Sequence, residues 1–384
     1  MQYADAMRAL FWLSAGLLAY AQAGYGLLLA GLARLAGRRS PLPTRAAPAG
    51  TPDVSLIVAA YREEAVIADK VRNALALDWP RERLQIVIAV DGGVDAGADA
   101  TARRAREAGA DLVLELPRGG KMRAQDAAVA ASRGELLAFS DANALWEPGA
   151  LRALADAFAD PEVAYACGQV AFVNDDGTNQ EGLYWRYELW LRAQESALAS
   201  VTGGNGAIYA VRRADYVVPA VPMGHDLFLP FTLVQRGRRA VYAAGARATE
   251  KMVPTIEGEW ARKRRMMTQA WPIVLHGGLL RLGAYPPLYA LMIASHRILR
   301  YLSPLLHVLA FAASLALSRR RLYAAAAAAQ AALVAAALAG GRIRSRPLLI
   351  ARYYVLTTAS LAAGLHDHLR HGTPAGWEPA EGTR

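Results

Sequence analysis

LLAFSDANALWEPGAL, residues 136–151, contains a hydrophobic run that stops at Ser140, Asp141, Ala142 and Asn143. Such a run predicts a buried strand, and open α/β sheets bind their ligands at the carboxyl ends of their strands. A carboxylate and an amide two residues apart are oxygen ligands that a divalent cation accepts. The alternative is an Asx turn that caps the helix expected to begin near Pro148.

The same pattern of strand, polar end and helix recurs earlier in the chain. Apolar runs at 54–60 and 84–90 end in polar stretches that include Glu63 and Asp91. Strands that alternate with helices predict an α/β fold with a mostly parallel sheet. The strand ends would then meet at one sheet edge, where several carboxylates repel each other unless a cation joins them. This crowding favours a divalent ion at Asp141 over a simple turn.

The first apolar stretch predicts a membrane anchor within residues 1–40. Residues 9–33 carry no charge, and at about 1.5 Å per helical residue they are long enough to cross a bilayer core of roughly 30 Å. A signal peptide is the alternative, but its apolar region is usually only about 7–15 residues long. We therefore interpret the stretch as an anchor.

Three further candidate spans follow a globular domain predicted at 51–275. They lie at 301–317, at 322–341 and, more weakly because Arg352 interrupts it, at 347–365. We expect C-terminal transmembrane helices at 301–370 and a tail at 371–384.

The segment at 276–300 is interpreted as an interfacial amphipathic segment under the active site. It contains Pro286 and Pro287 and ends with Arg297 and Arg300, which suit a headgroup boundary. A hydrophobic core helix of the globular domain is the alternative. About four spans leave little polar surface to line a pore. We therefore expect short or single additions to an acceptor, or else a homodimer or an export partner.

The net charge of +10 is not interpreted as a sign of nucleic-acid binding. Much of the basic excess flanks the predicted spans or adjoins the suspected site, including Arg38, Arg39 and Arg45. The positive-inside rule predicts a multi-pass protein of the plasma (inner) membrane with its globular domain in the cytoplasm, in contact with membrane lipids. The run SRRR at 318–321 conflicts with this orientation. The lone Cys167 excludes a disulfide within the chain and fits a reducing compartment.

Seven motifs follow one another along the chain: AAYREE, VDGG, RGGK, SDAN, GGNGAIYAVRR, GHDLFLPFTLVQRG and EWARKRRM. In this order they resemble the family 2 glycosyltransferases, which are inverting enzymes of the GT-A fold. The similarity covers about residues 53–270 and extends more loosely through SHRILRYLSP at 295–304. It implies a hexosyltransferase-type, polysaccharide-synthase-like membrane enzyme that uses a nucleotide sugar in exopolysaccharide or cell-envelope glycan synthesis. A UDP-sugar is the expected donor, and a glycan or a lipid-linked molecule the expected acceptor.

The resemblance assigns the nucleotide pocket to Ala60, Tyr61 and Glu63, and the hydrogen bond to the base to Asp91. A turn-forming Asp before two glycines is the alternative for Asp91. Lys121 follows two glycines at an expected helix start, a good place to meet phosphate; an exposed lysine is its alternative.

The metal and the catalytic base are also implied by the resemblance. Asp141 and Asn143 match a D-x-D signature with Asn in the last place, which implies Mg²⁺ or Mn²⁺ as cofactor. Asp226 stands in GHDLFLP where the family has its base, which takes the acceptor proton during inversion. His225 stands where an acidic neighbour is common, and a capping role is the favoured interpretation for it.

The remaining motifs are assigned to the acceptor and the diphosphate. Gly204, Asn205 and Gly206 would form the acceptor floor, with an ordinary tight turn as the alternative. Cations of the basic motif would stabilise the diphosphate, or would form a solvated juxtamembrane run; they are Arg262, Lys263 and Arg265. This motif lacks the Trp of Q-x-x-R-W. A non-catalytic membrane scaffold with a degenerate transferase domain is therefore the alternative function.

Overall fold

The computed structural model describes residues 2–36, 51–95, 97, 99–173, 183–220, 223–251, 256–343, 345–374 and 376. The basic residues Arg38, Arg39 and Arg45, and most of the predicted tail at 371–384, lie outside the described residues.

Within this part of the chain, the strands form one mixed eight-stranded sheet in the order β3-β2-β1-β4-β7-β6-β8-β5. β1 to β4 are mutually parallel, as are β6 and β8, whereas β7 and β5 run antiparallel to their neighbours. The predicted α/β fold is confirmed. The strands are β1 (Val54–Ala60), β2 (Leu84–Asp91), β3 (Leu112–Leu116), β4 (Leu136–Asp141), β5 (Leu145–Trp146), β6 (Val163–Val173), β7 (Ile208–Arg212) and β8 (Arg239–Lys251).

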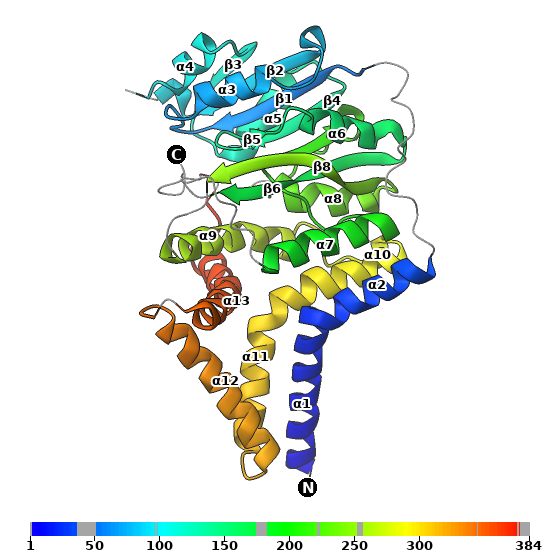
Figure 1. Ribbon diagram of the computed structural model, residues 1–384, viewed down its shortest axis with the longest axis vertical. Helices are drawn as coiled ribbons and strands as arrows, with labels where there is room; N and C mark the ends of the chain where they lie inside the picture. Colours follow the sequence, from blue (N-terminus) through cyan, green and yellow to red (C-terminus); the bar gives the residue numbers. More distant parts are fainter. Residues whose placement is uncertain are drawn as a thin grey trace.

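The helices cover both faces of the sheet and continue below it (Figure 1). Those of the globular domain are α3 (Ile67–Leu75), α4 (Thr101–Glu107), α5 (Lys121–Ala131), α6 (Ala150–Asp156), α7 (Leu183–Leu198), α8 (His225–Gln235) and α9 (Ile256–Leu275). The terminal helices are α1 (Gln2–Ala19), α2 (Tyr25–Leu35), α10 (Pro287–Met292), α11 (Leu299–Ala316), α12 (Arg321–Ala339) and α13 (Arg346–His371).

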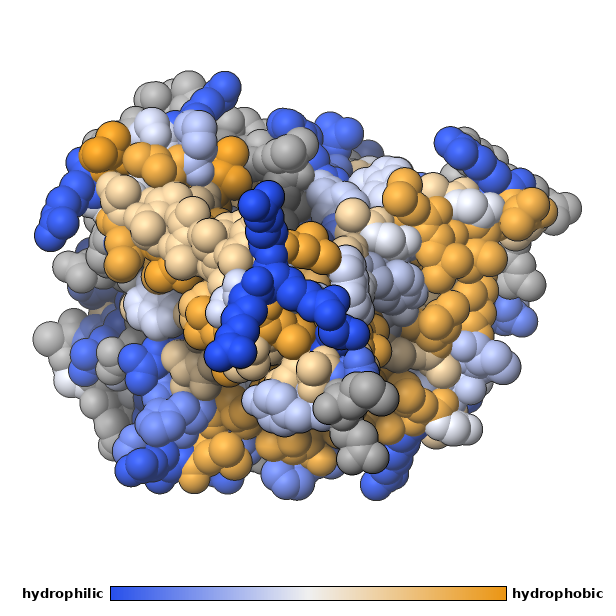
Figure 2. All heavy atoms as spheres, turned by 90° about the horizontal axis from the view of Figure 1, so that it is seen from below, coloured by the Kyte–Doolittle hydropathy of each residue, from blue (hydrophilic) through white to orange (hydrophobic). Residues whose placement is uncertain are grey.

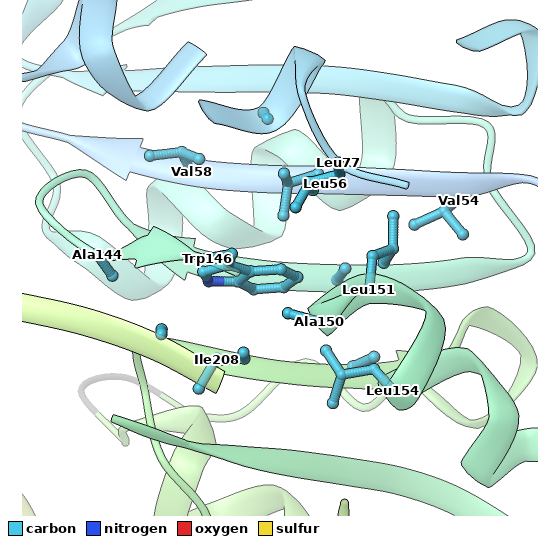
Figure 3. Close-up of a cluster of buried hydrophobic side chains, with 14 of the residues drawn as sticks. Val54, Leu56, Val58, Leu77, Ala144, Trp146, Ala150, Leu151, Leu154 and Ile208 are labelled. Carbon is cyan, nitrogen blue, oxygen red and sulfur yellow. The ribbon is translucent and has the colours of Figure 1, made fainter. Parts of the chain in front are cut away.

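The residues of β1 alternate between the two faces, as the two-residue period of a strand requires. Leu56 and Val58 belong to one buried cluster, which α3 and α6 close and in which Trp146 lies centrally (Figure 3). Ile57 and Ala59 belong to a second cluster, closed by α5, α7, α8 and residues of α2 and α10. The terminal helices therefore pack directly on the globular domain.

The register of the parallel strands brings the predicted site residues to one edge. Ala59 of β1 pairs with Asp141 of β4, and Ala60 pairs with Val90, the residue before Asp91. The ends of β1, β2 and β4 consequently lie side by side, where parallel strands of an α/β sheet place their ligands.

Four helices among the described residues are long and apolar enough to cross a membrane: Tyr3–Leu35, Pro287–Ala316, Arg321–Ala339 and Arg346–His371. α1, α11 and α12 project away from the sheet, whereas α2 and α10 turn beneath the globular domain (Figure 1). Both bends coincide with π-helical turns, η1 (Tyr20–Gly24) and η7 (Ile293–Ile298).

The structure differs from the prediction at 276–300. Pro287 begins α10 at a position where proline is tolerated because its missing N–H would have no helical partner. The helix then continues through η7 and α11 without a break at residue 300. Arg297 and Arg300, expected at lipid headgroups, donate hydrogen bonds to Thr202 and Glu188 of the globular domain.

The loop between α11 and α12 lies at the end of the helices remote from the sheet (Figure 1). It leads into three exposed arginines, Arg319, Arg320 and Arg321. Figure 2 views this end and shows a hydrophilic projection surrounded by hydrophobic surface. The conflict between this basic loop and the positive-inside rule therefore persists in the structure.

Candidate active site

Three predicted site residues from different elements converge around Gly206. A Cβ atom added to Gly206 would lie 3.9 Å from a carboxylate oxygen of Asp226 and 3.9 Å from the Nζ atom of Lys121. Lys121 in turn forms an ion pair with Asp141. The amino termini of α5 and α8 thus place an ammonium group and a carboxylate beside Gly206, and the carboxyl end of β4 supplies the second carboxylate, which pairs with that ammonium group.

Lys121 is held as a cation at this point. It follows Gly120, whose φ of 95° is a conformation that favours glycine. Burial alone would lower the pKa of Lys121, but the charge and hydrogen bond of Asp141, together with Asp226 and Glu250, raise that pKa above its usual value. The ammonium group is therefore suited to bind an anion that enters between these carboxylates.

Asp91 is 2% exposed and binds the turn that precedes α5. Its carboxylate accepts hydrogen bonds from the backbone N–H groups of Gly119 (2.6 Å) and Gly120 (3.1 Å), and it pairs with Arg118. The Arg118 guanidinium also lies 3.3 Å from the centre of the Tyr61 ring. Arg118, the first residue of the RGGK motif, for which no role was predicted, therefore contacts both Tyr61 and Asp91.

The end of β1 turns sharply after Ala60. Arg62 has a φ of 53° and is the one non-glycine residue with positive φ in the described ranges, a feature often found at functional sites. The Glu63 side chain is only 2% exposed, and its backbone N–H donates to Thr101. Glu63 is therefore buried, whereas Tyr61 is partly exposed.

Lys70 is a buried lysine near Asp141 for which no role was predicted. It is fully buried, its Nζ donates to the carbonyl of Ala144 at 2.7 Å, and it lies 5.1 Å from the Trp146 ring centre. Burial lowers its pKa to about 7, against the opposing effects of Asp141 and Glu250. The signal was available, because Lys70 interrupts the apolar face of α3 formed by Ile67, Val71 and Ala74.

Asp141 and Asn143 lie in one turn at the end of β4, and both are partly exposed. The described residues contain no group of three His, Cys, Asp or Glu side chains that could hold a metal. Mg²⁺ is usually bound by one or two carboxylates plus substrate phosphates and water, so this pair fits such an ion. The ammonium of Lys121 against Asp141 shows that this carboxylate already attracts a cation.

Asp226 lies in the first turn of α8, where the helix dipole stabilises a carboxylate. Its neighbour His225 points elsewhere: it is 2% exposed and contacts the hydroxyls of Tyr209 (2.9 Å) and Tyr216 (3.1 Å). The two adjacent residues therefore have separate environments. His225 is the first residue of α8 but does not cap it, because α8 has no side-chain cap hydrogen bond and the His225 ring contacts the two tyrosines instead.

The loop at 202–206 lies directly beside Asp226. The N–H of Gly204 donates to the backbone carbonyl of Asp226 at 2.6 Å, and a Cβ atom on Gly204 would lie 1.8 Å from the Tyr165 hydroxyl. Asn205 accepts a hydrogen bond from the N–H of Ala207 (3.1 Å), as in a tight turn. Gly204 thus provides close packing, and Gly206 faces Asp226 and Lys121.

The predicted diphosphate-binding cations lie on α9 and are engaged with other side chains. Arg262 pairs with Glu259 through two contacts of 2.8 and 2.9 Å. Lys263 lies 3.0 Å from the Tyr353 hydroxyl of α13. Arg265 lines a cavity of about 350 Å³ between α9 and the end of α13. Both predicted roles, diphosphate binding and a juxtamembrane charge run, stay predictions.

The sheet order and the polar edge at β1, β2 and β4 fit the expected GT-A fold. Residues 52–269, more than half of the chain, match the family described as Glycosyltransferase like family 2. The chain belongs to this family, as the motifs in its sequence indicated, which makes it a transferase.

Two glucosyl-lipid synthases, by name, are similar to part of the chain. Beta-monoglucosyldiacylglycerol synthase of Trichormus variabilis is 29% identical over 168 residues, which cover 42% of this chain and 36% of that protein. The corresponding synthase of Nostoc sp. is 28% identical over the same shares. The match thus spans about a third of the length of these relatives.

One solved structure resembles almost the whole chain. It is the mannosyltransferase PcManGT from Pyrobaculum calidifontis, in complex with GDP-Man and Mn²⁺. The TM-score is 0.69 at 23% identity, and the alignment covers 94% of this chain and 99% of that one. At this identity the likeness supports the fold, terminal helices included.

Proposed function

We propose that this protein is an inverting glycosyltransferase that moves a sugar from a nucleotide-sugar donor, a UDP-sugar, to a lipid-held acceptor at the cytoplasmic face of the inner membrane. The observation that carries the proposal is the convergence of Asp226, Lys121 and Asp141 around Gly206. A base, a phosphate-binding cation and a metal-binding carboxylate are the groups that this transfer needs.

Each of these groups has one task in the reaction. Asp226 accepts the proton of the acceptor hydroxyl as that oxygen attacks the anomeric carbon, a contribution of about 10²–10⁴-fold for a positioned base. The bond from that carbon to the diphosphate breaks as the new bond forms, which inverts the configuration. Lys121 binds the departing diphosphate. Asp141 and Asn143 would hold Mg²⁺ or Mn²⁺, which supplies Lewis-acid neutralisation of that diphosphate when bound.

The nucleoside is assigned to the part of the same sheet edge formed by the ends of β1 and β2. Ala60 and Tyr61 would line its pocket, with Asp91 hydrogen-bonding the base and Glu63 supporting the pocket from below. The contacts of Arg118 with Tyr61 and Asp91 support one shared pocket. The contact between Arg118 and the Asp91 carboxylate would have to break before the nucleotide base could bind that carboxylate.

A lipid-held acceptor is favoured by the position of the loop at 202–206. Side chains of the long apolar helix that begins at Pro287 bind the start of this loop and the residue before it. Arg297 donates to the hydroxyl of Thr202 at 3.0 Å, and the hydroxyl of Tyr289 donates to the carbonyl of Val201 at 2.9 Å. An acceptor hydroxyl at this loop would therefore approach from the membrane side. The products of the relatives, glucosyl lipids by name, agree with such an acceptor.

The test is a panel of donors offered to the purified full-length protein in phosphatidylglycerol vesicles with Mn²⁺ or Mg²⁺. The donors are radiolabelled UDP- and GDP-sugars, and the acceptors are dioleoylglycerol, a bacterial lipid extract and soluble oligosaccharides. We expect label from a UDP-sugar in the lipid fraction. Transfer only to soluble saccharide would overturn the lipid acceptor, and use of GDP-sugars alone would overturn the UDP donor.

A further inference from the structure

Buried charged side chains connect the apolar helices to the globular domain directly behind the loop at 202–204. Glu195 of α7 is 1% exposed and His296 of η7 is 4% exposed, and their side chains are 2.7 Å apart. Tyr25 of α2 donates its hydroxyl to the same carboxylate at 2.6 Å. Burying a carboxylate is costly unless it is paired and hydrogen-bonded, so three elements are fixed to one another here.

The same carboxylate holds the start of the acceptor loop. Thr202 is fully buried, and its backbone N–H donates to Glu195 at 3.1 Å. Burial alone would raise the pKa of Glu195, but His296, Arg297 and the Tyr25 hydroxyl lower it below the usual value. Glu195 is thus an ionised anchor for Thr202.

Arg297 contacts the loop from the other side. Its Nε donates to the Thr202 hydroxyl at 3.0 Å and to the Thr202 carbonyl at 3.2 Å. Its guanidinium lies close against the next residue, since a Cβ atom on Gly203 would be 2.3 Å from Nη2. Only a glycine leaves room for the guanidinium at this position.

The loop is also hydrogen-bonded to Asp226, the predicted base. Gly204 follows directly, and its N–H donates to the carbonyl of Asp226, while Arg192 donates to the carbonyl of Gly204 at 3.1 Å. A chain of direct contacts therefore runs from Arg297 through Thr202–Gly204 to the first turn of α8.

We propose that Arg297 is a positioning residue for glycosyl transfer, by which the helix Pro287–Ala316 holds Thr202–Gly204 against the turn that carries Asp226. This inference rests on the proposed function, since it assumes that this loop binds the acceptor. The helix Pro287–Ala316 bends at η7, which contains Arg297, and π-helical turns are frequent at functional sites. The apolar helix would then be part of the active site as well as an anchor.

The test compares Arg297→Ala with Arg300→Ala in the full-length protein. Arg300 lies on the same helix but pairs with Glu188, so Arg300→Ala is the matched control. Misplacement of reacting groups by about 1 Å can cost about 100-fold in rate. We expect Arg297→Ala to lower kcat for transfer to lipid about 10- to 100-fold, with the Kd for UDP and Mn²⁺ unchanged. Arg300→Ala should keep the wild-type kcat.

Gly203→Ala provides a second variant that does not remove the arginine. Its methyl group would displace the guanidinium, so we expect Gly203→Ala to reproduce the loss seen with Arg297→Ala. The double variant should then be no worse than either single one, because coupled residues are not additive. Gly31→Ala in α2, where no atom lies within 4 Å of the added carbon, controls for glycine replacement. Losses that multiply in the double variant would overturn the proposal.

Hydrogen exchange of the peptide spanning 200–207 gives a readout that does not need turnover. The amides of Thr202 and Gly204 are both hydrogen-bonded, and we expect both Arg297→Ala and Gly203→Ala to lose protection there, with Arg300→Ala unchanged. If Arg297→Ala does not fold, Arg297→Lys replaces it. An inactive wild-type enzyme would refute the proposed function, but wild-type protection in Arg297→Ala and Gly203→Ala would refute this inference.

Discussion

The ammonium group of Lys121 contacts the carboxylate of Asp141 across the carboxyl edge of the sheet. A divalent cation at Asp141 would therefore meet a positive charge already in place. We expect Lys121→Met to bind Mn²⁺ more tightly than the wild type when no nucleotide is present. It should also bind UDP more weakly, because a cation that meets the diphosphate is lost.

Titration calorimetry with Mn²⁺ alone, and then with UDP at saturating Mn²⁺, separates these two effects. Arg123→Met, on the same helix, is the control for the loss of a nearby charge. Unchanged UDP affinity in Lys121→Met would show that Lys121 does not bind the diphosphate.

Asp141→Ala should abolish transfer while leaving the fold intact, because the proposed metal loses its charged ligand. Asn143→Asp should be tolerated, since a carboxylate carries a negative charge that the amide lacks and is also an oxygen ligand for such a cation. The measurement is transfer rate against Mn²⁺ concentration, with circular dichroism as the check on folding. Full turnover of folded Asp141→Ala in excess chelator would contradict the assignment.

Asp226→Asn should lower turnover by about 10²–10⁴-fold, the usual contribution of a positioned base. The amide is nearly the same size as the carboxylate, so donor binding should be unchanged. Steady-state kcat and the Kd for UDP are the two quantities to measure. A normal kcat would mean that another residue accepts the proton.

Lys70 should make the stability of the folded protein depend on pH. Burial lowers its pKa to about 7, whereas a lysine in an unfolded chain titrates at about 10.4. Between these values the unfolded chain binds more protons at Lys70 than the folded chain does. The free energy of unfolding therefore rises with pH in this interval, and below it the effect is constant.

Lys70→Met removes this titration and leaves the Ala144 carbonyl without its donor, at a cost of about 1–3 kcal/mol. We expect the wild-type melting temperature minus that of Lys70→Met to increase from about pH 7 to about pH 9 in metal-free detergent solution. A constant difference over this range would show that Lys70 does not titrate there.

The sequence predicted best those features that depend on local pattern. The strand at 136–141, and the placement of Asp91 and Asp141 at one edge, follow from apolar runs that end in polar residues. The position of Asp226 beside Gly206 depends on how α8 and the loop after α7 pack together, which no local pattern contains. Residue roles there came from the resemblance alone.

The predicted boundary at residue 300, between an interfacial segment and a span, is a feature that the local pattern predicted wrongly. Pro286 and Pro287 were interpreted as a break and the arginines beyond them as a headgroup boundary. In the structure Pro287 starts a helix that continues to Ala316, and Arg297 and Arg300 bind the globular domain. A sequence shows that an arginine is near an apolar segment, but its partner, here Thr202 or Glu188, lies about 100 residues away in the chain.

The most direct test of the proposed function is the anomeric configuration of the product. Purified protein in vesicles is given UDP-α-glucose labelled at the anomeric carbon, dioleoylglycerol and Mn²⁺, and the lipid extract is analysed by NMR. Single displacement with Asp226 as the base predicts a β-linked glucosyl lipid bearing one sugar or a few. An α-linked product, or label confined to free glucose or to a long polysaccharide, would contradict it.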